Sequence, residues 1–441
     1  MEKLTEENIL KNQKHNQKLY KFYKMIGWDM LFYYAISFLF LVQVKGLSTS
    51  QIIFADAFYP LFKIILQLPC TILIEKIGKR NCLILGNLSI ATYVLIVMGL
   101  SSIVGFIISN IFCALGFILK EITEANILHD SIENSKNKRN IFSKIDSSGS
   151  ALYYCVDAVT SIFAGFLFII NPYLPMSLCL ICLAISIFLA YNFKEIPITA
   201  EEEKEEIPYS NLSVPEQFKY YILDLKQAFK FIFKSDRLRS LILFYALFST
   251  LLTNMTTLRR SLLNEILVPE QYFGILFAIW GIIAALSSKY STYIQAHHRN
   301  HTLGFIGILY TLSVLFAGLA ATLIGLPKFI TYFICLAAFS LQFSIKGPFY
   351  TLINRYLGSF STSTMRTKIS SANLLIENIT CTLITFAISY LTDNFSTAFS
   401  TLMIGIIFTL ILITVLSYMK TRVGLKPEEY KDSDIHFNEL Y

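Results

Sequence analysis

Seven charged residues interrupt stretches of sequence that are otherwise apolar. Three lie near the centres of their stretches and four lie toward one end, namely Lys63, Asp157 and Glu377, and then Lys120, Glu121, Glu124 and Lys346. A charge at the centre of a helix in a lipid bilayer costs about 2.5 to 3.5 kcal/mol. Such residues are kept where they pair with one another or act on a ligand, an ion or a proton, so all seven are candidates for a substrate cavity or a proton-coupling site.

The spacing of three of these charges predicts a pair. Lys120 and Glu124 are four residues apart, so on a helix they share a face and can neutralise each other. Glu121 then remains the unpaired carboxylate of the group. Lys63 and Glu377 lie at similar depths in two further apolar stretches, and we expect them to form a second pair.

Asp157 is the first candidate for a proton carrier. A carboxylate that is half-buried near the middle of an apolar helix exchanges protons at working pH, because burial disfavours its charged form. Asp157 lies about 15 Å along a helix from Ser147, at 1.5 Å per residue, and no basic residue of the same stretch lies within two turns. Glu121 is the reserve candidate. By contrast, Asp29 and Asp56 lie near the ends of their stretches, where we expect them at the membrane interface. Arg259 and Arg260 lie near the outer end of theirs, where we expect them to reach outward, with one of them facing the cavity as the alternative.

Composition indicates the class of protein that carries these residues. The chain has 441 residues, of which 54% are hydrophobic and 15% charged, and its mean hydropathy is +0.56. These values are typical of a protein that crosses the membrane many times. The net charge of +7 does not indicate a nucleic-acid partner, because the basic residues lie between the apolar stretches and not on one folded face.

The apolar stretches are long enough to be membrane-spanning helices, each of which needs about 20 mostly apolar residues. Twelve are predicted, at 26–44, 52–74, 82–100, 103–128, 147–169, 174–193, 239–262, 270–292, 302–322, 328–350, 368–390 and 395–418. The predicted fold is therefore an all-α membrane protein with two six-helix bundles, 26–193 and 239–418. An N-terminal segment (1–25), a central loop (194–238) and a tail (419–441) lie outside them, and the acidic block Glu201–Glu206 keeps part of the central loop in water.

Short repeats suggest that the two bundles arose by duplication. The sequence KIDSS begins at Lys144 and KISSA at Lys368, while LSTSQ begins at Leu47 and LVPEQ at Leu267. The two pairs have nearly the same separation along the chain, which predicts pseudo-symmetric halves. Most Lys and Arg residues fall in the two termini, the central loop and alternate short loops, so all of these are expected on the cytoplasmic side of the cell membrane.

This architecture resembles that of major facilitator superfamily transporters, and two motifs add to the resemblance. Glu75, Gly78, Lys79 and Arg80 look like the short acidic-x-x-Gly-basic-Arg loop of that family, in which the glycine makes a tight turn and the charges cap neighbouring helix ends. The stretch from Gly116 to Leu152, which includes Glu124 and Asp130, is similar to a pattern of bacterial drug-efflux members. The resemblance implies a cytoplasmic gate formed by Glu75, Gly78, Lys79, Arg80 and Asp130.

The expected function is secondary active transport by alternating access. No GxxxxGK[ST] motif is present, which disfavours ATP as the energy source. The leading hypothesis is proton-coupled export of small amphipathic molecules, with proton-coupled uptake of a nutrient or metabolite as the alternative. A membrane enzyme or a receptor is a further alternative that no HExxH motif or Ser/His/Asp group supports. The expected partners are a small-molecule substrate, protons and membrane lipids, for a chain that acts as a monomer without a cofactor or a bound metal.

Reporter fusions test the predicted orientation. A reporter placed in the 194–238 segment and another placed after Lys426 should both report the cytoplasmic side, because basic residues near the spans stay inside. An external signal at either site would contradict the arrangement of twelve spans.

Overall fold

The computed structural model describes residues 6–133, 138–196, 214–289, 293, 301–323, 327–359 and 363–419. All secondary structure in these residues is helical. The acidic block Glu201–Glu206, the short loop at 294–300 and the tail from 420 lie outside the described residues, so the expectations about them stay predictions.

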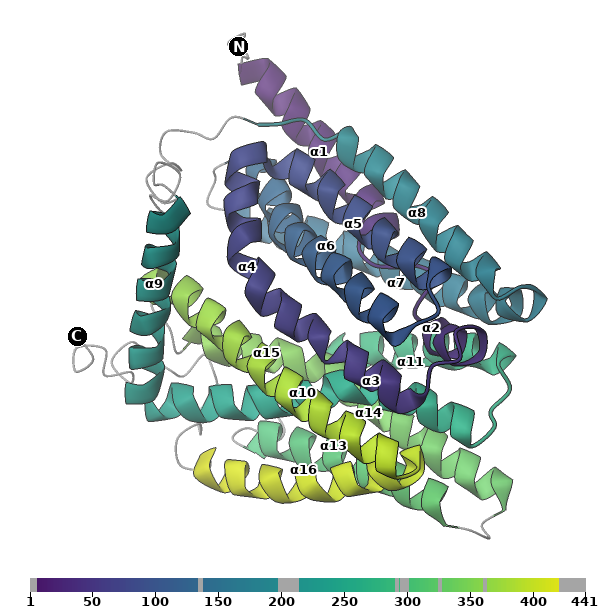
Figure 1. Cartoon of the computed structure of the whole chain (residues 1–441). Coiled ribbons are helices and arrows are strands. Elements are labelled where there is room, and N and C mark those ends of the chain that lie inside the picture. Colours follow the sequence, from purple (N-terminus) through teal and green to yellow (C-terminus); the bar gives the residue numbers. More distant parts are fainter. Residues whose placement is uncertain are drawn as a thin grey trace. The chain divides into compact units, whose positions relative to one another are not determined.

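Figure 1 shows the helices in chain order. In the first half they are α1 (Glu6–Gly27), α2 (Ser37–Leu39), the π-helix η1 (Phe40–Val44), α3 (Thr49–Asp56), α4 (Phe58–Ile77), α5 (Lys79–Gly99), α6 (Ile103–Asp130), α7 (Lys138–Ile170) and α8 (Tyr173–Tyr191). In the second half they are α9 (Val214–Lys234), α10 (Asp236–Glu265), α11 (Gln271–Lys289), α13 (Thr302–Thr322), α14 (Lys328–Ser359), α15 (Ser363–Asn394) and α16 (Thr397–Met419).

Ten of the described helical segments are long and apolar enough to cross a membrane, with α3 and α4 counted together as one span. A shorter apolar helix, Gln271–Ser287, corresponds to the predicted eighth span. The predicted first span is not one helix, because residues 28–36 leave helical geometry between α1 and α2. The all-α membrane fold is therefore confirmed, while the count of twelve spans stays a prediction.

The chain divides into two compact units, and the predicted boundaries of the two bundles stay a prediction. Unit 1 contains Met1–Leu47, Phe62–Lys219 and Glu270–Ala278, and unit 2 contains Ser48–Leu61, Tyr220–Pro269 and Ile279–Tyr441. Each repeat motif has the same place in its own half. Lys144 and Lys368 lie in the second turn of α7 and α15, and Leu47 and Leu267 shortly precede α3 and α11. These matching positions agree with a duplicated unit.

In unit 1, α5 and α6 approach each other closely at two glycines. A Cβ atom built on Gly116 would lie 2.8 Å from the backbone oxygen of Gly86, and one built on Gly86 would lie 3.1 Å from that of Gly116. Without side chains at these positions the two backbones can touch, as small residues allow in membrane helix pairs. This contact fixes α6, which carries three of the candidate charges, against the neighbouring helix.

In unit 2, aromatic side chains fill the core around α10. Phe248 lies 4.6 Å from Phe349 and 5.2 Å from Tyr310, measured between ring centroids, and Phe244 packs on the same group. Gly318 on α13 and Gly405 on α16 leave room for the backbone of the facing helix, as the glycine pair does in unit 1. Each unit thus contains a pair of helices in close backbone contact.

The predicted central loop contains a helix that sequence patterning did not place there. In α9, Ala228, Phe231 and Ile232 are buried in the main hydrophobic cluster of unit 2. The described part of this segment is therefore a packed helix, whereas the sequence predicted only a solvated linker.

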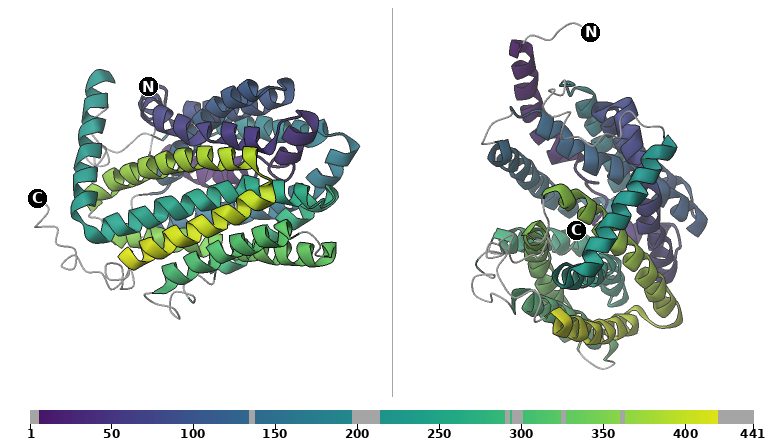
Figure 2. Two further views of the ribbon diagram at one scale, coloured as in Figure 1. Left: turned by 60° about the horizontal axis from the view of Figure 1, so that its bottom comes forward. Right: turned by 90° about the vertical axis from the view of Figure 1, so that its left-hand side faces the viewer.

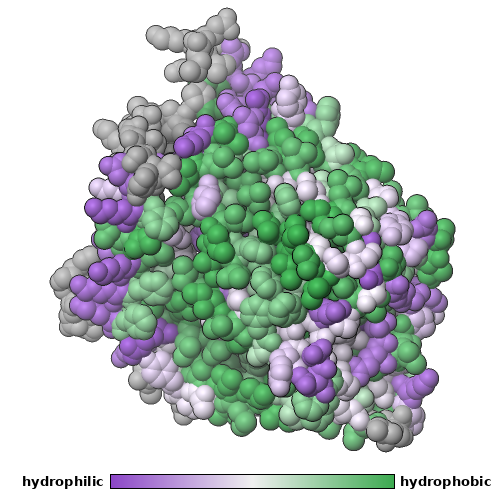
Figure 3. All heavy atoms as spheres, in the orientation of Figure 1, coloured by the Kyte–Doolittle hydropathy of each residue, from purple (hydrophilic) through white to green (hydrophobic). Residues whose placement is uncertain are grey.

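The outer surface is apolar where a membrane-spanning helix would meet lipid. Hydrophobic residues predominate over α4, α5 and α6 (Figure 3), and several of their large side chains are exposed, among them Ile65, Leu88, Leu95, Val104 and Ile108. Exposed apolar area of this extent is uncommon in soluble proteins and is expected on a surface covered by acyl chains.

A pair of glycine substitutions tests the close contact in unit 1. Gly116→Ala should lower the free energy of unfolding by about 1 to 3 kcal/mol, because its Cβ would overlap Gly86 and Ile90. Gly281→Ala is the matched control, since no atom lies within 4 Å of its added Cβ and alanine favours a helix by up to about 1 kcal/mol. Thermal unfolding in detergent should show a lower midpoint for the first variant alone, and equal midpoints would contradict the packing.

Candidate functional site

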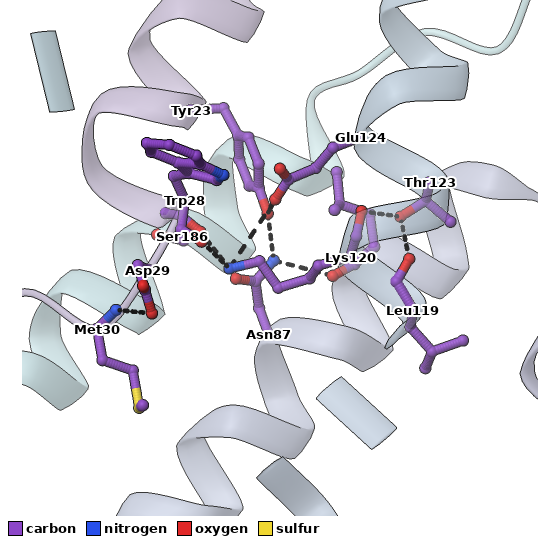
Figure 4. Close-up of polar contacts among 12 residues, drawn as sticks. Tyr23, Trp28, Asp29, Met30, Asn87, Leu119, Lys120, Thr123, Glu124 and Ser186 are labelled. Carbon is purple, nitrogen blue, oxygen red and sulfur yellow. Dashed lines mark hydrogen bonds and ion pairs between the residues drawn. The ribbon is translucent and has the colours of Figure 1, made fainter. Parts of the chain in front are cut away.

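The interrupted first span is the centre of a polar cluster in unit 1 (Figure 4). The chain leaves α1 at Gly27 and regains helical geometry only at Ser37. Phe32, within this interruption, has a φ of 64°, which is unusual for a residue with a side chain. The last carbonyl groups of α1 consequently lack partners in a following turn and need other donors.

Lys120 supplies those donors. Its side chain is only 2% exposed, and its Nζ donates hydrogen bonds to the carbonyl oxygens of Gly27 and, at 3.3 Å, of Trp28. The C-terminal end of a helix carries partial negative charge and favours a cation. Lys120 Nζ also lies 3.9 Å from Glu124 Oε1, so the predicted pair is confirmed.

A chain of buried hydrogen bonds extends from this ion pair. The Tyr23 hydroxyl donates to Glu124 at 3.1 Å, and Asn87 Nδ2 donates to the same hydroxyl oxygen at 2.9 Å. Tyr23, Asn87 and Glu124 come from α1, α5 and α6, and all three are buried. These hydrogen bonds join the three helices, while the side-chain oxygen of Asn87 is buried without a hydrogen-bond partner among the described residues.

One turn before the end of α1, a second buried base is paired. Lys24 Nζ contacts Asp146 of α7, and the Tyr20 hydroxyl donates to the same carboxylate at 2.9 Å. Burial, reinforced by the charges of Asp146 and Glu124, raises the pKa of the Tyr20 phenol well above its ordinary value. Tyr20 therefore stays neutral and acts as a hydrogen-bond donor.

Asp29 lies inside the interruption, next to an aromatic group. Its Oδ1 accepts hydrogen bonds from the Tyr34 hydroxyl at 2.8 Å and from the Met30 amide at 2.9 Å. The neighbouring Trp28 packs edge-on against Tyr153 and Tyr154 of α7, with ring centroids 4.9 and 5.5 Å apart. Sequence reasoning assigned Asp29 to the membrane interface and so missed its place beside the other candidate residues.

Asp157 follows those two tyrosines by one turn of α7 and is half-buried. Its carboxylate forms no hydrogen bond or ion pair with any described residue, and it interacts with the charge of Asp29. The charge of Asp29 thus acts on Asp157, and no base of the described residues pairs with Asp157.

Glu121 and Lys63 form an ion pair, with Lys63 Nζ at 3.0 Å and 3.3 Å from the two carboxylate oxygens. The expectation that Glu121 is unpaired is therefore wrong, because α4 presents Lys63 to it. Glu121 is 60% exposed, whereas the Lys63 side chain is 20% exposed, so the acid is the solvated member of the pair.

In unit 2, Glu377 accepts hydrogen bonds from the hydroxyls of Tyr245, at 2.9 Å, and Ser249. Lys346 is exposed on α14. A pairing of Lys63 with Glu377 stays a prediction.

The loop between α4 and α5 has the geometry expected from its glycine. Gly78 has a φ of 86° and is the residue before α5, and Glu75 is exposed on the last turn of α4. Lys79 Nζ lies 2.8 Å from Asp130 Oδ2 at the end of α6, and the Arg80 guanidinium lies 5.8 Å from the centre of the Tyr191 ring. The loop thus joins the ends of α5, α6 and α8.

Arg259 and Arg260 are only 5% and 8% exposed, so the expectation that they reach outward is wrong. Arg259 donates to Gln342 Oε1 at 3.0 Å, and its guanidinium carbon lies 4.3 Å from the centre of the Phe343 ring. Trp280 and Phe339 contribute further ring faces. Little in the sequence indicated that Arg259 is buried, because the residues that contact it come from α11 and α14.

Most of the chain matches known membrane transporters. The family model of the Major Facilitator Superfamily matches residues 22–373. The chain belongs to this superfamily. Among solved structures, the nucleoside transporter NupG aligns with a TM-score of 0.63 at 10% identity, covering 96% of this chain and 100% of the other.

Two other solved structures have a similar fold. A bacterial homologue of the human lysosomal transporter Spinster, in an inward-facing and unoccupied conformation, aligns with a TM-score of 0.65 at 12% identity over 96% of this chain and 99% of the other. A D-xylose-proton symporter aligns with a TM-score of 0.61 at 13% identity over 96% and 98%. A search of curated proteins gave no match. This member of the superfamily is therefore a transporter and not an enzyme, with a substrate that these relatives leave open.

Replacing the buried base tests the polar cluster. Lys120→Met should lower the free energy of unfolding by about 3 to 5 kcal/mol, because it leaves the Glu124 carboxylate buried without its partner. The double variant Lys120→Met with Glu124→Gln should recover part of that loss, since no unpaired charge remains. Thermal unfolding of these two variants and of Glu124→Gln alone in detergent measures the effects, and a loss in the double variant equal to the sum of the two single losses would mean that the pair does not interact.

Proposed function

We propose that the chain is a secondary active transporter that exports small amphipathic molecules by alternating access, driven by proton entry. The observation that carries proton coupling is Asp157, a half-buried carboxylate that pairs with no described residue and experiences the charge of Asp29. Two carboxylates held near each other repel when both are charged, and a proton on either one relieves the repulsion. Asp157 is the group that exchanges this proton with solvent, because Asp29 is already bonded to Tyr34 and Met30.

The aromatic group beside these acids supports an amphipathic substrate. Trp28, Tyr153 and Tyr154 pack on one another, and Tyr154 is 48% exposed. Ring faces of this kind bind the flat apolar part of a ligand. A substrate with a cationic group would compete with the proton for Asp157. Because the two cannot bind this carboxylate together, the export of one is coupled to the entry of the other.

The remaining charges of unit 1 serve the conformational change in this proposal. The Lys79 and Asp130 ion pair joins two helix ends beside the turn at Gly78, and it acts with Glu75 and Arg80 as the cytoplasmic gate. Lys63, Glu121, Lys120 and Glu124 form ion pairs that stabilise one arrangement of α4, α6 and the broken first span. In this proposal Glu377 and Lys346, which belong to unit 2, also serve the conformational change.

Export as the direction rests on the resemblance of the stretch from Gly116 to Leu152 to drug-efflux members. Proton-coupled uptake of a small nutrient or metabolite would use the same residues with the fluxes reversed. Proteoliposomes of one orientation, loaded with a pH-sensitive dye and screened against a compound library, separate the two. Proton flux coupled to substrate leaving the cytoplasmic side supports export, and substrate entry together with protons supports uptake.

Asp157→Asn tests the proton carrier directly. The variant should lose gradient-driven substrate movement, down to the level of empty vesicles, because an amide keeps the size of the side chain but cannot titrate. Substrate binding and passive exchange should persist. Asp157→Glu is the matched control and should retain pH-dependent transport, whereas an Asp157→Asn protein that still works against a gradient would transfer the role to Glu121 or Glu377.

A further inference from the structure

Helix α9 is fixed to unit 2 by one of its faces. Phe231, Ile232 and Ala228 are buried there, and Lys368 of α15 bridges to Asp224 at 2.7 Å and donates to Gln227 at 2.8 Å. The helix is therefore held in one orientation about its own axis, and its opposite face is presented outward.

The outward face carries an apolar stripe. Phe218, Ile222, Phe229 and Phe233 recur at intervals of four and seven residues, which places them in one row along a helix. Phe218 is 54% exposed, Ile222 48% and Phe233 64%. The Phe229 and Phe233 rings stack on each other with centroids 6.4 Å apart, so the exposed row is continuous at its end.

A row of four lysines runs beside the apolar stripe. Lys219, Lys226, Lys230 and Lys234 lie on the adjoining helix surface and are all exposed. None of the four forms an ion pair with another residue of the described chain. Their ammonium groups therefore present positive charge along one edge of the stripe.

The direction of α9 differs from that of its neighbour. From Tyr220 onward α9 belongs to unit 2, where it runs across α10 rather than along it (Figure 2), and only Ser235 separates the two helices. Because α10 is long and apolar enough to span the membrane, a helix that crosses its direction at its end lies along the membrane surface.

We propose that α9 is a binding site for anionic phospholipids at the membrane surface. The row of Phe218, Ile222, Phe229 and Phe233 enters the boundary between headgroups and acyl chains, and the four lysines contact lipid phosphates. An amphipathic helix with aromatic residues beside lysines binds an anionic bilayer in this way. The proposal is independent of the substrate and of the direction of transport.

Amine labelling of the full-length protein tests this site. The protein is placed in nanodiscs, one copy in each, made of phosphatidylcholine alone or mixed with phosphatidylglycerol, and treated with an amine-reactive ester. Lys226 and Lys230 should react about fivefold more slowly in the anionic discs, as expected for a lysine held at a charged surface. Added salt should reverse the slowing, because it screens the charges.

The chain contains its own control. Lys11, Lys14 and Lys18 are exposed on α1, where they do not adjoin a comparable apolar row, and their reactivity should be the same in both lipids. Phe218→Ser combined with Phe233→Ser should reduce the protection of the α9 lysines with little change in thermal stability, because both rings are exposed. Equal reactivity of the α9 lysines in both lipids would overturn the proposal and leave the face to a protein partner. Equal slowing of the α1 and α9 lysines would also overturn it, since it would reflect the charge of the disc and not a site on α9.

Discussion

The ammonium of Lys120 lies against the two carbonyl groups at which α1 ends, and much of unit 1 depends on this contact. A helix that stops inside an apolar environment leaves its last carbonyls unsatisfied, at a cost of several kcal/mol for each in hydrocarbon. Lys120 removes that cost while Glu124 balances its charge. The chain can then leave helical geometry at Gly27, which places Trp28 and Asp29 beside α7.

Features that depend on local spacing were predictable from the sequence. The Lys120 and Glu124 pair follows from four residues of separation on one helix. The turn at Gly78 follows from the conformational freedom of glycine, which alone adopts a φ near 86° without strain. The membrane-spanning helices follow from the length and hydropathy of their stretches, and the family from their arrangement together with the short loop motif.

Features that depend on partners far along the chain were not predictable. The apolar stretch 26–44 has the composition of a continuous span, and its interruption is stabilised by donors from α6. Glu121 was expected to be unpaired because Lys63 comes from α4, and Arg259 was expected to reach outward because its aromatic partners come from α11 and α14. Residues 214–234 contain enough lysine to resemble a linker, although their apolar residues recur at helical spacing, and the packing of Phe231 and Ile232 on unit 2 shows that the helix belongs to the fold.

The broken first span also has a consequence for biogenesis. Lys120 is 93 residues downstream of the Gly27 carbonyl that it satisfies, and a membrane protein emerges from the ribosome starting from its N-terminus. While α6 is still inside the ribosome, the carbonyl groups at the end of α1 lack the hydrogen bonds from Lys120, and the polar cluster around Asp29 is incomplete. The nascent first span must therefore first adopt another conformation or remain in a more polar environment. It reaches its final conformation only after α6, which carries Lys120, is inserted. Assembly of unit 1 is then a step that follows translocation of the fourth predicted span, and not a sum of independently inserted helices.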